Sequence, residues 1–295
     1  MAENFDSFDN FAAEYKPRIE ERLEACISGC SDDCPAQLKE AMRYSLLAPG
    51  KRIRPLLVLL ACDAVGGEVE EAMAAACAVE MVHAFSLIHD DLPCMDDDDI
   101  RRGQPTNHKV YGEGEALLAG DALLAYVFTF LAEKLDQEKA LFCIRELSQA
   151  TLSMIGGQSD DLRGVSDGAD SDALEFLHNR KTGALIEASL RMGGFLGGAD
   201  EESLKGLSAY GSQIGLAFQI QDDLLDTEGE EATTGKSVGK DAERGKLTFP
   251  VLLGKEESEQ KAQELVEEAC DSVSLFGDRA RPLQDLASFV IQRRS

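Results

Sequence analysis

The segment EAMAAACAVEMVHAFSLIHDDLPCMDDDDIRRG spans residues 71–103. Up to His89 its apolar side chains recur at helical spacing, so this part predicts a buried α-helix. Six aspartates then follow within ten positions, and two arginines come after them. Because neighbouring carboxylates repel one another and resist ionising unless they share a cation, this run predicts a positively charged partner.

The same helical spacing extends over most of the chain. Ala, Leu and Glu dominate the apolar segments, which are 56–65, 114–135, 141–158, 184–197 and 204–226. The breaks at 163–172 and 227–246 are rich in Gly, Asp and Ser, but neither marks a domain boundary. We therefore predict one all-α domain over residues 1–295.

Charge and composition exclude several kinds of partner. The chain has 295 residues, with 55 acidic against 29 basic side chains and a formal net charge of -26. This balance excludes nucleic acid and anionic membrane surfaces, since both need an extended basic field. The acidic N-terminal segment has no basic targeting region, and no apolar stretch approaches the length that spans a bilayer. We expect a cytoplasmic protein that is not an integral membrane protein.

Eight cysteines are scattered through the sequence and are expected to be reduced, since no secretory signal is present. Cys26, Cys30 and Cys34 repeat at the four-residue spacing of a helix face, which leaves a metal site open. Pro35 ends that helix, however, and zinc sites usually need a second, well-spaced pair of ligands. Buried thiols without a ligand are therefore the favoured alternative.

A second acidic cluster follows another long apolar segment. It contains Gln219, Asp222, Asp223 and Asp226 at i, i+3, i+4 and i+7, which places all four on one helix face. These hard oxygen ligands are of the kind that Mg²⁺ prefers. A solvated face near a helix end is the equally weighted alternative.

The first cluster needs a bend to bring its carboxylates together. Asp90 and Asp96 would lie on different sides of a continuous helix, but Pro93 breaks that helix and lets Asp96 return toward Asp90. His83 is seven residues before Asp90 and therefore lies on the same face. A histidine packed in the core without a ligand is the alternative interpretation of His83. Because His83 points the same way as the carboxylates, a functional role is favoured.

Basic residues occur in three short groups and in the loop 227–246. The groups contain Lys51, Arg52 and Arg54, then Arg101 and Arg102, then Arg180 and Lys181 beside Thr182. The loop adds Lys236, Lys240, Arg244 and Lys246, which makes it a candidate lid. Arginine binds phosphate oxygens in a bidentate manner and lysine acts as a point charge. Together with two acidic metal sites, these cations predict a site for two diphosphates inside a helical bundle.

Six motifs, in order, resemble the trans-isoprenyl diphosphate synthases (polyprenyl synthetases), most closely the bacterial farnesyl diphosphate synthase group. They are RYSLLAPGKRIRP (43–55), SLIHDDLPCMDDDDIRRGQPTNHKVYGE (86–113), RKTGALI (180–186), GLAFQIQDDLLD (215–226), GKSVGKD (235–241) and KLTFPVLLG (246–254). The resemblance implies an isoprenoid-synthase-type bundle of antiparallel helices around a central cavity, and a homodimer. It also implies a reaction in which an allylic diphosphate ionises with three Mg²⁺ ions and isopentenyl diphosphate attacks the carbocation.

Position by position, the resemblance implies a role for each candidate. The principal Mg²⁺ ligands would be Asp90, Asp96 and Asp222, with helpers at Asp91, Asp223 and Asp226. The allylic diphosphate would be held by Arg101, Lys181 and Lys240. The isopentenyl diphosphate site would contain Lys51, Arg54, His83 and Arg102. The carbocation would be stabilised by oxygens of Thr182 and Gln219.

The resemblance implies that product length depends on the residues five and four before Asp90, which are Phe85 and Ser86. A bulky ring at Phe85 resembles enzymes that stop at the C15 product, farnesyl diphosphate. Geranylgeranyl diphosphate (C20) is the alternative, and a ring packed in an interhelical core is an equally good interpretation of Phe85. Pro49 stands where the family usually has Gly, and MDDDD replaces the commoner MDNDD.

Other classes fit the sequence less well. A class I terpene cyclase usually has an Asn/Ser/Glu pattern at its second site, whereas this chain has DDLLD there. An HD-type phosphohydrolase needs more histidines than the chain offers. A non-catalytic acidic Ca²⁺-binding protein is the alternative from a different class, but Arg101 falls where an EF-hand loop starting at Asp96 needs Gly. A non-catalytic synthase subunit would be expected to lose one Asp motif, and both are present.

Overall fold

The computed structural model describes residues 7–31, 33–164, 171–228 and 247–292. As predicted, these residues are almost entirely helical. The helices are α1 (Phe8–Ser28), α2 (Ala36–Leu46), α3 (Ile53–Ala64), α4 (Val69–Asp90), α5 (Asn107–Tyr111), α6 (Glu113–Lys134), α7 (Gln137–Arg163), α8 (Ser171–His178), η1 (Asn179–Gly183), α9 (Ala184–Leu196), α10 (Glu201–Glu228), α13 (Phe249–Leu253), α14 (Lys255–Ser272), η2 (Ser274–Ala280) and α15 (Arg281–Gln292). The predicted lid, with Lys236, Lys240, Arg244 and Lys246, lies outside the described residues.

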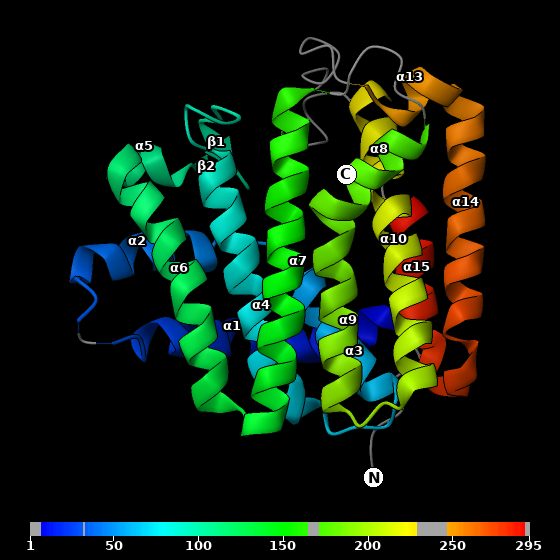
Figure 1. The fold of residues 1–295 in the computed structure, drawn as a ribbon, viewed down its shortest axis with the longest axis horizontal. Helices are drawn as coiled ribbons and strands as arrows, with labels where there is room; N and C mark the ends of the chain where they lie inside the picture. Colours follow the sequence, from blue (N-terminus) through cyan, green and yellow to red (C-terminus); the bar gives the residue numbers. More distant parts are fainter. Residues whose placement is uncertain (1–6, 32, 165–170, 229–246, 293–295) are drawn as a thin grey trace.

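The long helices stand side by side as a bundle, while α1 lies across one side of it (Figure 1). In the centre α3 packs against α4 and α9, and α4 also packs against α6. From Pro55 to Ala64 every side chain of α3 is buried, as expected for a helix that is apolar all round. At Gly193 the two backbones of α3 and α9 touch, because an added Cβ would lie 1.9 Å from the Val58 carbonyl oxygen.

The carboxyl-terminal ends of α4, α7 and α10 lie at one end of the bundle (Figure 1). Helix carboxyl ends carry a partial negative charge, so carboxylates placed there need compensating cations. Both predicted acidic clusters occur at this end, since Asp90 is the last residue of α4 and Asp222 is in the last two turns of α10. The fold therefore gathers the acidic residues where cations are most needed.

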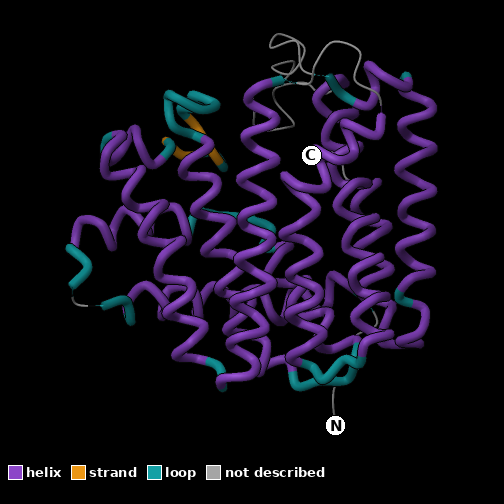
Figure 2. The backbone as a smooth tube through the Cα atoms, in the orientation of Figure 1, coloured by secondary structure: helices purple, strands orange, loops and turns teal. Residues whose placement is uncertain are grey.

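A short hairpin was not predicted. Strands β1 (Ile100–Arg101) and β2 (Gln104–Pro105) pair antiparallel directly after the aspartate run (Figure 2). Arg102 and Gly103 form the two-residue connection with φ of 52° and 76°, which is the type I′ geometry that suits a tight hairpin. This turn sets the directions of the two neighbouring arginines.

The cysteines behave only partly as predicted. All eight are free thiols, as expected. Helix α1 ends at Ser28, so Cys30 and Cys34 lie beyond it, and the three cysteines do not share one helix face. In the described part of the chain these thiols form no metal-binding group of three ligands.

Two helices are long and apolar enough to cross a membrane, namely α4 and α6, so the expectation that no stretch reaches this length is wrong. The two helices differ in burial. In the most apolar stretch of α4 72% of the residues are buried, whereas in that of α6 only 39% are buried. Helix α4 is thus a core helix of the bundle. Helix α6 keeps much of its apolar surface exposed.

Candidate active site

The first acidic cluster is folded back on itself after α4. The backbone N–H of Asp96 donates to the Asp90 carbonyl oxygen at 2.8 Å, so the predicted return of Asp96 toward Asp90 is present. Leu92 accepts a hydrogen bond from the N–H of Asp97, whose φ of 51° is left-handed. These bonds close the turn around Pro93 and hold two carboxylates at the end of one helix.

Charges from three other segments surround Asp90. Burial raises the pKa of its carboxyl to about 6; Lys181 and Arg101 oppose this rise, and Asp96 and Asp161 add to it. A carboxyl that is desolvated beside other carboxyls is stabilised in its charged form by a bound cation. The end of α4, the η1 segment and the end of α7 therefore meet around one electrostatic centre.

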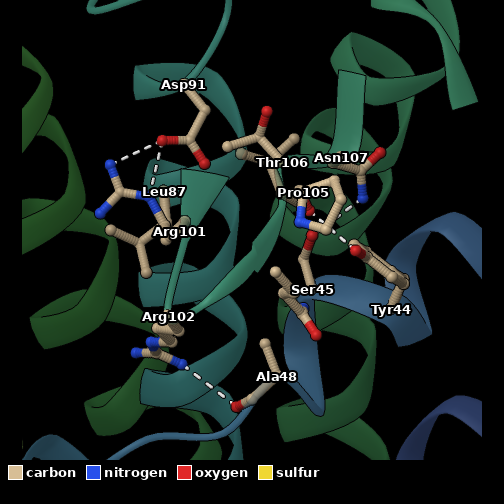
Figure 3. A pocket seen from close by; sticks show the side chains of 12 residues that line it. Tyr44, Ser45, Ala48, Leu87, Asp91, Arg101, Arg102, Pro105, Thr106 and Asn107 are labelled. Atoms are coloured by element: carbon tan, nitrogen blue, oxygen red, sulfur yellow. Dashed lines mark hydrogen bonds and ion pairs between the residues drawn. The ribbon is translucent and has the colours of Figure 1, made fainter. Parts of the chain in front are cut away.

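Asp91 points to a different partner. Its Oδ1 accepts a hydrogen bond from Arg101 Nε at 2.6 Å and forms an ion pair with Arg101 Nη2 at the same distance (Figure 3). Burial raises the pKa of Asp91 to about 6, even though the Arg101 guanidinium opposes this rise. Asp91 thus holds Arg101 in place, while its predicted role as a metal-binding helper stays a prediction.

The second cluster lies on α10 as predicted, but its members differ in burial. Asp223 is buried and accepts hydrogen bonds from Gln219 Nε2 at 3.2 Å and from the backbone N–H of Phe249 at 3.1 Å. Asp222 and Asp226 are half-buried. Asp223 therefore ties α10 to the start of α13, and Asp222 and Asp226 are the better placed of the three carboxylates for a ligand.

Thr182 and Gln219 are connected directly. The Thr182 hydroxyl donates to Gln219 Oε1 at 3.2 Å, and Lys181 Nζ lies 2.7 Å from Asp161 Oδ2. Lys181 and Thr182 lie in η1, a π-helix that packs against α7, which carries Asp161, and against α10, which carries Gln219. Single π-helical turns within α-helices occur frequently at functional sites. Thr182 and Gln219, the pair predicted to stabilise a carbocation, therefore lie with Lys181 at the acidic end of the bundle.

The predicted anion-binding groups on α3 and α4 also meet. Arg54 Nη1 lies 3.5 Å from His83 Nε2, and Arg54 Nε is buried without a hydrogen-bond partner among the described residues. Burial lowers the pKa of His83 well below its ordinary value, and Arg54 and Arg102 lower it further. A neutral imidazole beside two guanidinium groups, one with an unused donor, can accommodate an anion.

Arg102 joins this group from the hairpin. Its Nη1 donates to the Ala48 carbonyl oxygen at 3.3 Å, and a Cβ at Gly50 would lie 2.9 Å from the same nitrogen. Figure 3 shows the two guanidinium groups of Arg101 and Arg102 one above the other, with Asp91 and Ala48 as their partners. The loop that carries Lys51 and the loop that carries Arg102 therefore meet, as a shared site requires.

Arg52 has a role that sequence reasoning missed. It has a left-handed φ of 54° and its side chain is fully buried, where it bonds Glu80 at 2.6 Å, Glu20 at 2.7 Å and the Ala48 carbonyl oxygen at 2.8 Å. This network fixes the loop between Lys51 and Arg54. Glu80, an acidic residue in the middle of the apolar part of α4, was the signal in the sequence.

Arg52→Ala is expected to lower the free energy of unfolding by about 3–5 kcal/mol, because it leaves the Glu80 carboxylate buried without its partner. Urea denaturation measures this change. Arg18→Ala is the matched control, since Arg18 pairs with Glu70 while 44% of its side chain is exposed, and it should cost less than about 1 kcal/mol. Equal effects of the two substitutions would contradict a structural role for the buried network.

The candidate chain-length residues differ in environment. Phe85 is buried in the main core, with its ring edge-on to His89 at 4.9 Å between centroids. His89 in turn lies against α6, where its Nε2 is 3.0 Å from the Leu117 carbonyl oxygen. Ser86 is half-buried and donates to the His83 carbonyl oxygen at 2.9 Å. Phe85 therefore occupies the α4–α6 interface, and Ser86 leaves only a small side chain on the face of Asp90.

Comparisons with known proteins identify the class to which this fold and site belong. The family model described as Polyprenyl synthetase matches residues 35–275, so the chain belongs to this family. It is an enzyme, a short-chain trans-isoprenyl diphosphate synthase, as the sequence motifs predicted. The all-helical isoprenoid-synthase-type fold is likewise confirmed.

Particular relatives have different product names. Geranylgeranyl pyrophosphate synthase 11, chloroplastic, of Arabidopsis thaliana is 45% identical over 300 residues, covering 97% of this chain and 84% of the relative. A dimethylallyltranstransferase of Fischerella ambigua is 45% identical over 290 residues, covering 96% and 83%. The crystal structure of an FPP/GFPP synthase from Zymomonas mobilis superposes with a TM-score of 0.85 at 35% identity, covering 96% of this chain and 98% of that one.

Proposed function

We propose that this enzyme condenses isopentenyl diphosphate with dimethylallyl or geranyl diphosphate and stops at farnesyl diphosphate (C15). The observation that carries the proposal is the meeting of two charge centres at one end of the bundle. One is the acidic centre of Asp90 and Asp96, and the other is the group of Arg54 and Arg102 beside the neutral His83. Asp222 of α10 acts on Arg54 and lies at the same end of the bundle.

Magnesium fits the acidic centre. Its donors are carboxylate oxygens at helix carboxyl ends, and the raised pKa of Asp90 reflects a site that favours a cation. We assign Asp90, Asp96 and Asp222 as the principal ligands of three Mg²⁺ ions, with Asp91, Asp223 and the half-buried Asp226 in support. When bound, Mg²⁺ neutralises the developing charge on the departing diphosphate.

The protein's own groups would divide the remaining work. Lys181 and Arg101 lie near Asp90 and would bind the allylic diphosphate, with Lys240 as a predicted third group. Arg54, Arg102, His83 and Lys51 would hold isopentenyl diphosphate. The oxygens of Thr182 and Gln219 would face the carbocation, and the apolar interior would exclude water from it. The released proton would pass to the departing diphosphate.

The direct test incubates the protein with Mg²⁺, isopentenyl diphosphate and each allylic starter, then measures product lengths by mass spectrometry. Farnesyl diphosphate as the main product supports the proposal. Geranylgeranyl diphosphate (C20) as the main product would replace it with the alternative that the Arabidopsis relative's name favours. Absence of product with any starter would contradict the proposed substrates.

Phe85→Ala is expected to shift the main product to C20 or longer, because removal of the ring opens the interface that it fills beside His89. Liquid chromatography with mass spectrometry measures the product ratio. Phe142→Ala is the control, since Phe142 stacks on Phe195 at 3.7 Å and is expected to leave product length unchanged. If the cavity left by Phe85→Ala unfolds the protein, Phe85→Leu provides a second test with a smaller loss of volume. Unchanged products in both Phe85 variants would remove this residue from control of chain length.

The homodimer remains a proposal, and the outer face of α7 supports it. Leu141, Leu152, Ile155 and Leu162 are between 44% and 71% exposed, and their spacing puts them on one helix stripe. The neighbouring helix α6 adds Leu117 and Leu118, which are 45% and 53% exposed. A second copy of this chain is the occupant that we propose. The cytoplasmic location stays a prediction from the sequence.

Leu152→Asp is expected to weaken the dimer at least about 100-fold, because it places a charge at the centre of this stripe. Sedimentation velocity at several concentrations should give twice the chain mass of 32.0 kDa for the unmodified protein and the single-chain mass for the variant. Leu275→Asp is the control, since Leu275 is 48% exposed on η2, away from this stripe. A monomeric unmodified protein, or a variant that stays dimeric, would exclude this interface.

A further inference from the structure

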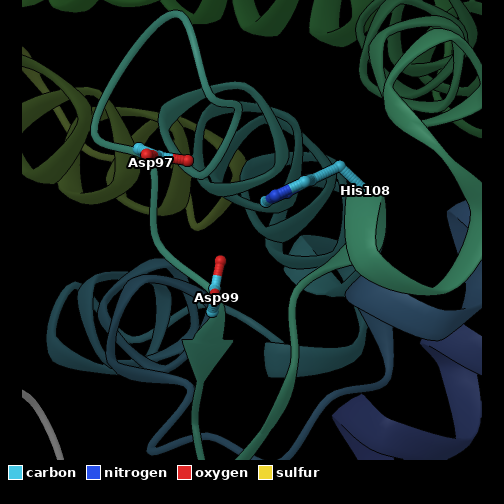
Figure 4. Close-up of side chains that lie close together, drawn as sticks. All are labelled: Asp97, Asp99 and His108. Carbon is cyan, nitrogen blue, oxygen red and sulfur yellow. The ribbon is translucent and has the colours of Figure 1, made fainter.

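Three side chains outside the proposed reaction centre form a possible ligand set. Asp97, Asp99 and His108 each offer one ligand atom, and these atoms all lie within 4.8 Å of one another (Figure 4). They come from the loop after Asp96, from the residue before β1 and from α5. The hairpin connects them, because the Thr106 N–H donates to the Asp99 carbonyl oxygen at 3.0 Å.

His108 is the member that points to a ligand. The residue is only 6% exposed, and its Nε2 is buried with no hydrogen-bond partner among the described residues. Figure 4 shows its ring tip directed into the space between Asp97 and Asp99. A buried polar atom without a partner costs about 1–3 kcal/mol, so a group that binds this nitrogen would be favoured.

The other ring nitrogen allows Nε2 to act as a ligand. His108 Nδ1 lies 3.1 Å from Thr106 Oγ1, so an Nδ1–H that donates to this hydroxyl leaves the lone pair on Nε2. Metal-binding histidines are commonly oriented by such a bond from their second nitrogen. Thr106 is itself buried and caps the start of α5. The imidazole is therefore held in one orientation before any ion binds.

The main charged neighbours of this group differ from those of Asp90. The charged groups that act on Asp90 are Lys181, Asp96, Arg101 and Asp161. Asp97 and Asp99 act instead on Lys109, whose Nζ lies 2.7 Å from Asp99 Oδ1. Lys109 would compete with an ion for the Asp99 carboxylate, which makes it a useful handle for a test.

We propose that Asp97, Asp99 and His108 form a second cation site that takes a divalent transition-metal ion, with Zn²⁺ the best match. One imidazole and two carboxylates are a mixed nitrogen and oxygen set, which suits Zn²⁺ and is unlike the all-oxygen set that suits Mg²⁺. A fourth position stays open to water. The ion ties the loop after Asp96 to α5, and the site does not depend on the proposed reaction.

Histidine NMR can test the site because the chain has only four histidines. Untagged protein labelled with ¹⁵N-histidine is saturated with Mg²⁺ and then titrated with Zn²⁺ up to a few equivalents. We expect the Nε2 resonance of His108, assigned with His108→Gln, to move to the range of a metal-bound nitrogen. No shift at His108, or a shift at another histidine alone, would overturn the proposal.

Variants of the carboxylates distinguish a built site from histidine binding alone. Asp97 and Asp99 are both exposed, so the variants Asp97→Asn and Asp99→Asn should fold normally. Each variant should weaken Zn²⁺ binding at His108 at least tenfold. Lys109→Met should strengthen it, because the competing ammonium is removed. Asp121→Asn is the matched control, since Asp121 is an exposed carboxylate 3.7 Å from a different histidine, His89, and it should have no effect. Unchanged affinity in both Asn variants would overturn the proposal.

Discussion

Asp90→Asn is expected to lower turnover by about 10³-fold while the protein stays folded. Asp90 is the carboxylate on which Asp96, Lys181 and Arg101 converge, so its charge is the one that we assign to the principal metal ligand. Loss of one such interaction removes several kcal/mol of stabilisation from the developing charge, and each 1.36 kcal/mol corresponds to a factor of about ten in rate. Steady-state turnover at saturating Mg²⁺ measures the effect.

The same substitution is expected to stabilise the metal-free protein. Because the pKa of Asp90 in the folded protein is raised from 3.8 to about 6, its favourable contribution is complete below pH 4 and is lost as the pH rises through 6. Asn does not titrate. The variant should therefore match the unmodified protein near pH 4 and exceed its free energy of unfolding above pH 7, by about 3 kcal/mol.

Two further variants make this result specific. Asp222→Asn should lose turnover to a similar degree, because Asp222 is the corresponding residue on α10. Asp121→Asn, on an exposed side chain of α6, should change neither turnover nor stability. An Asp90→Asn enzyme with full activity would remove Asp90 from the metal site, and a variant with lower stability at pH 7 would contradict its desolvation.

The helices were predictable because their signal is local. The segment 114–135 corresponds to α6, Glu113–Lys134, and 204–226 falls within α10, Glu201–Glu228. The hairpin was missed because two residues per strand carry no alternating pattern. Its I′ turn also uses Arg102 and Gly103, where Asn-Gly would have been the recognisable signal.

The site was predictable where one segment contains both partners. Pro93 between Asp90 and Asp96 was enough to predict the turn that joins them. The bonds of Asp223 to Phe249 and of Lys181 to Asp161 span 26 and 20 residues and depend on how helices pack. No local spacing in the sequence indicates such partners. The sequence therefore predicted which residues lie at the site, but not the hydrogen bonds and ion pairs that orient each side chain.

Arg54→Gln is expected to raise the KM for isopentenyl diphosphate about 100-fold and to leave the KM for the allylic diphosphate within about threefold. The Arg54 guanidinium is buried beside His83 and has a donor, Nε, without a partner among the described residues. A charge-assisted bond from such a group to an anion is worth about 2–5 kcal/mol when it is desolvated, which corresponds to a factor of this size.

The matched variant Arg54→Lys keeps the charge but loses the planar fork, so its KM for isopentenyl diphosphate should lie between the two. Lys181→Gln is the reciprocal control, since Lys181 acts on Asp90 at the other charge centre and should change the KM of the allylic substrate instead. If Arg54→Gln moved both KM values equally, the two diphosphates would not be divided between the two centres. The crossed pattern is expected because Arg54 lies 3.5 Å from His83 on α4, whereas Lys181 lies 2.7 Å from Asp161 on α7.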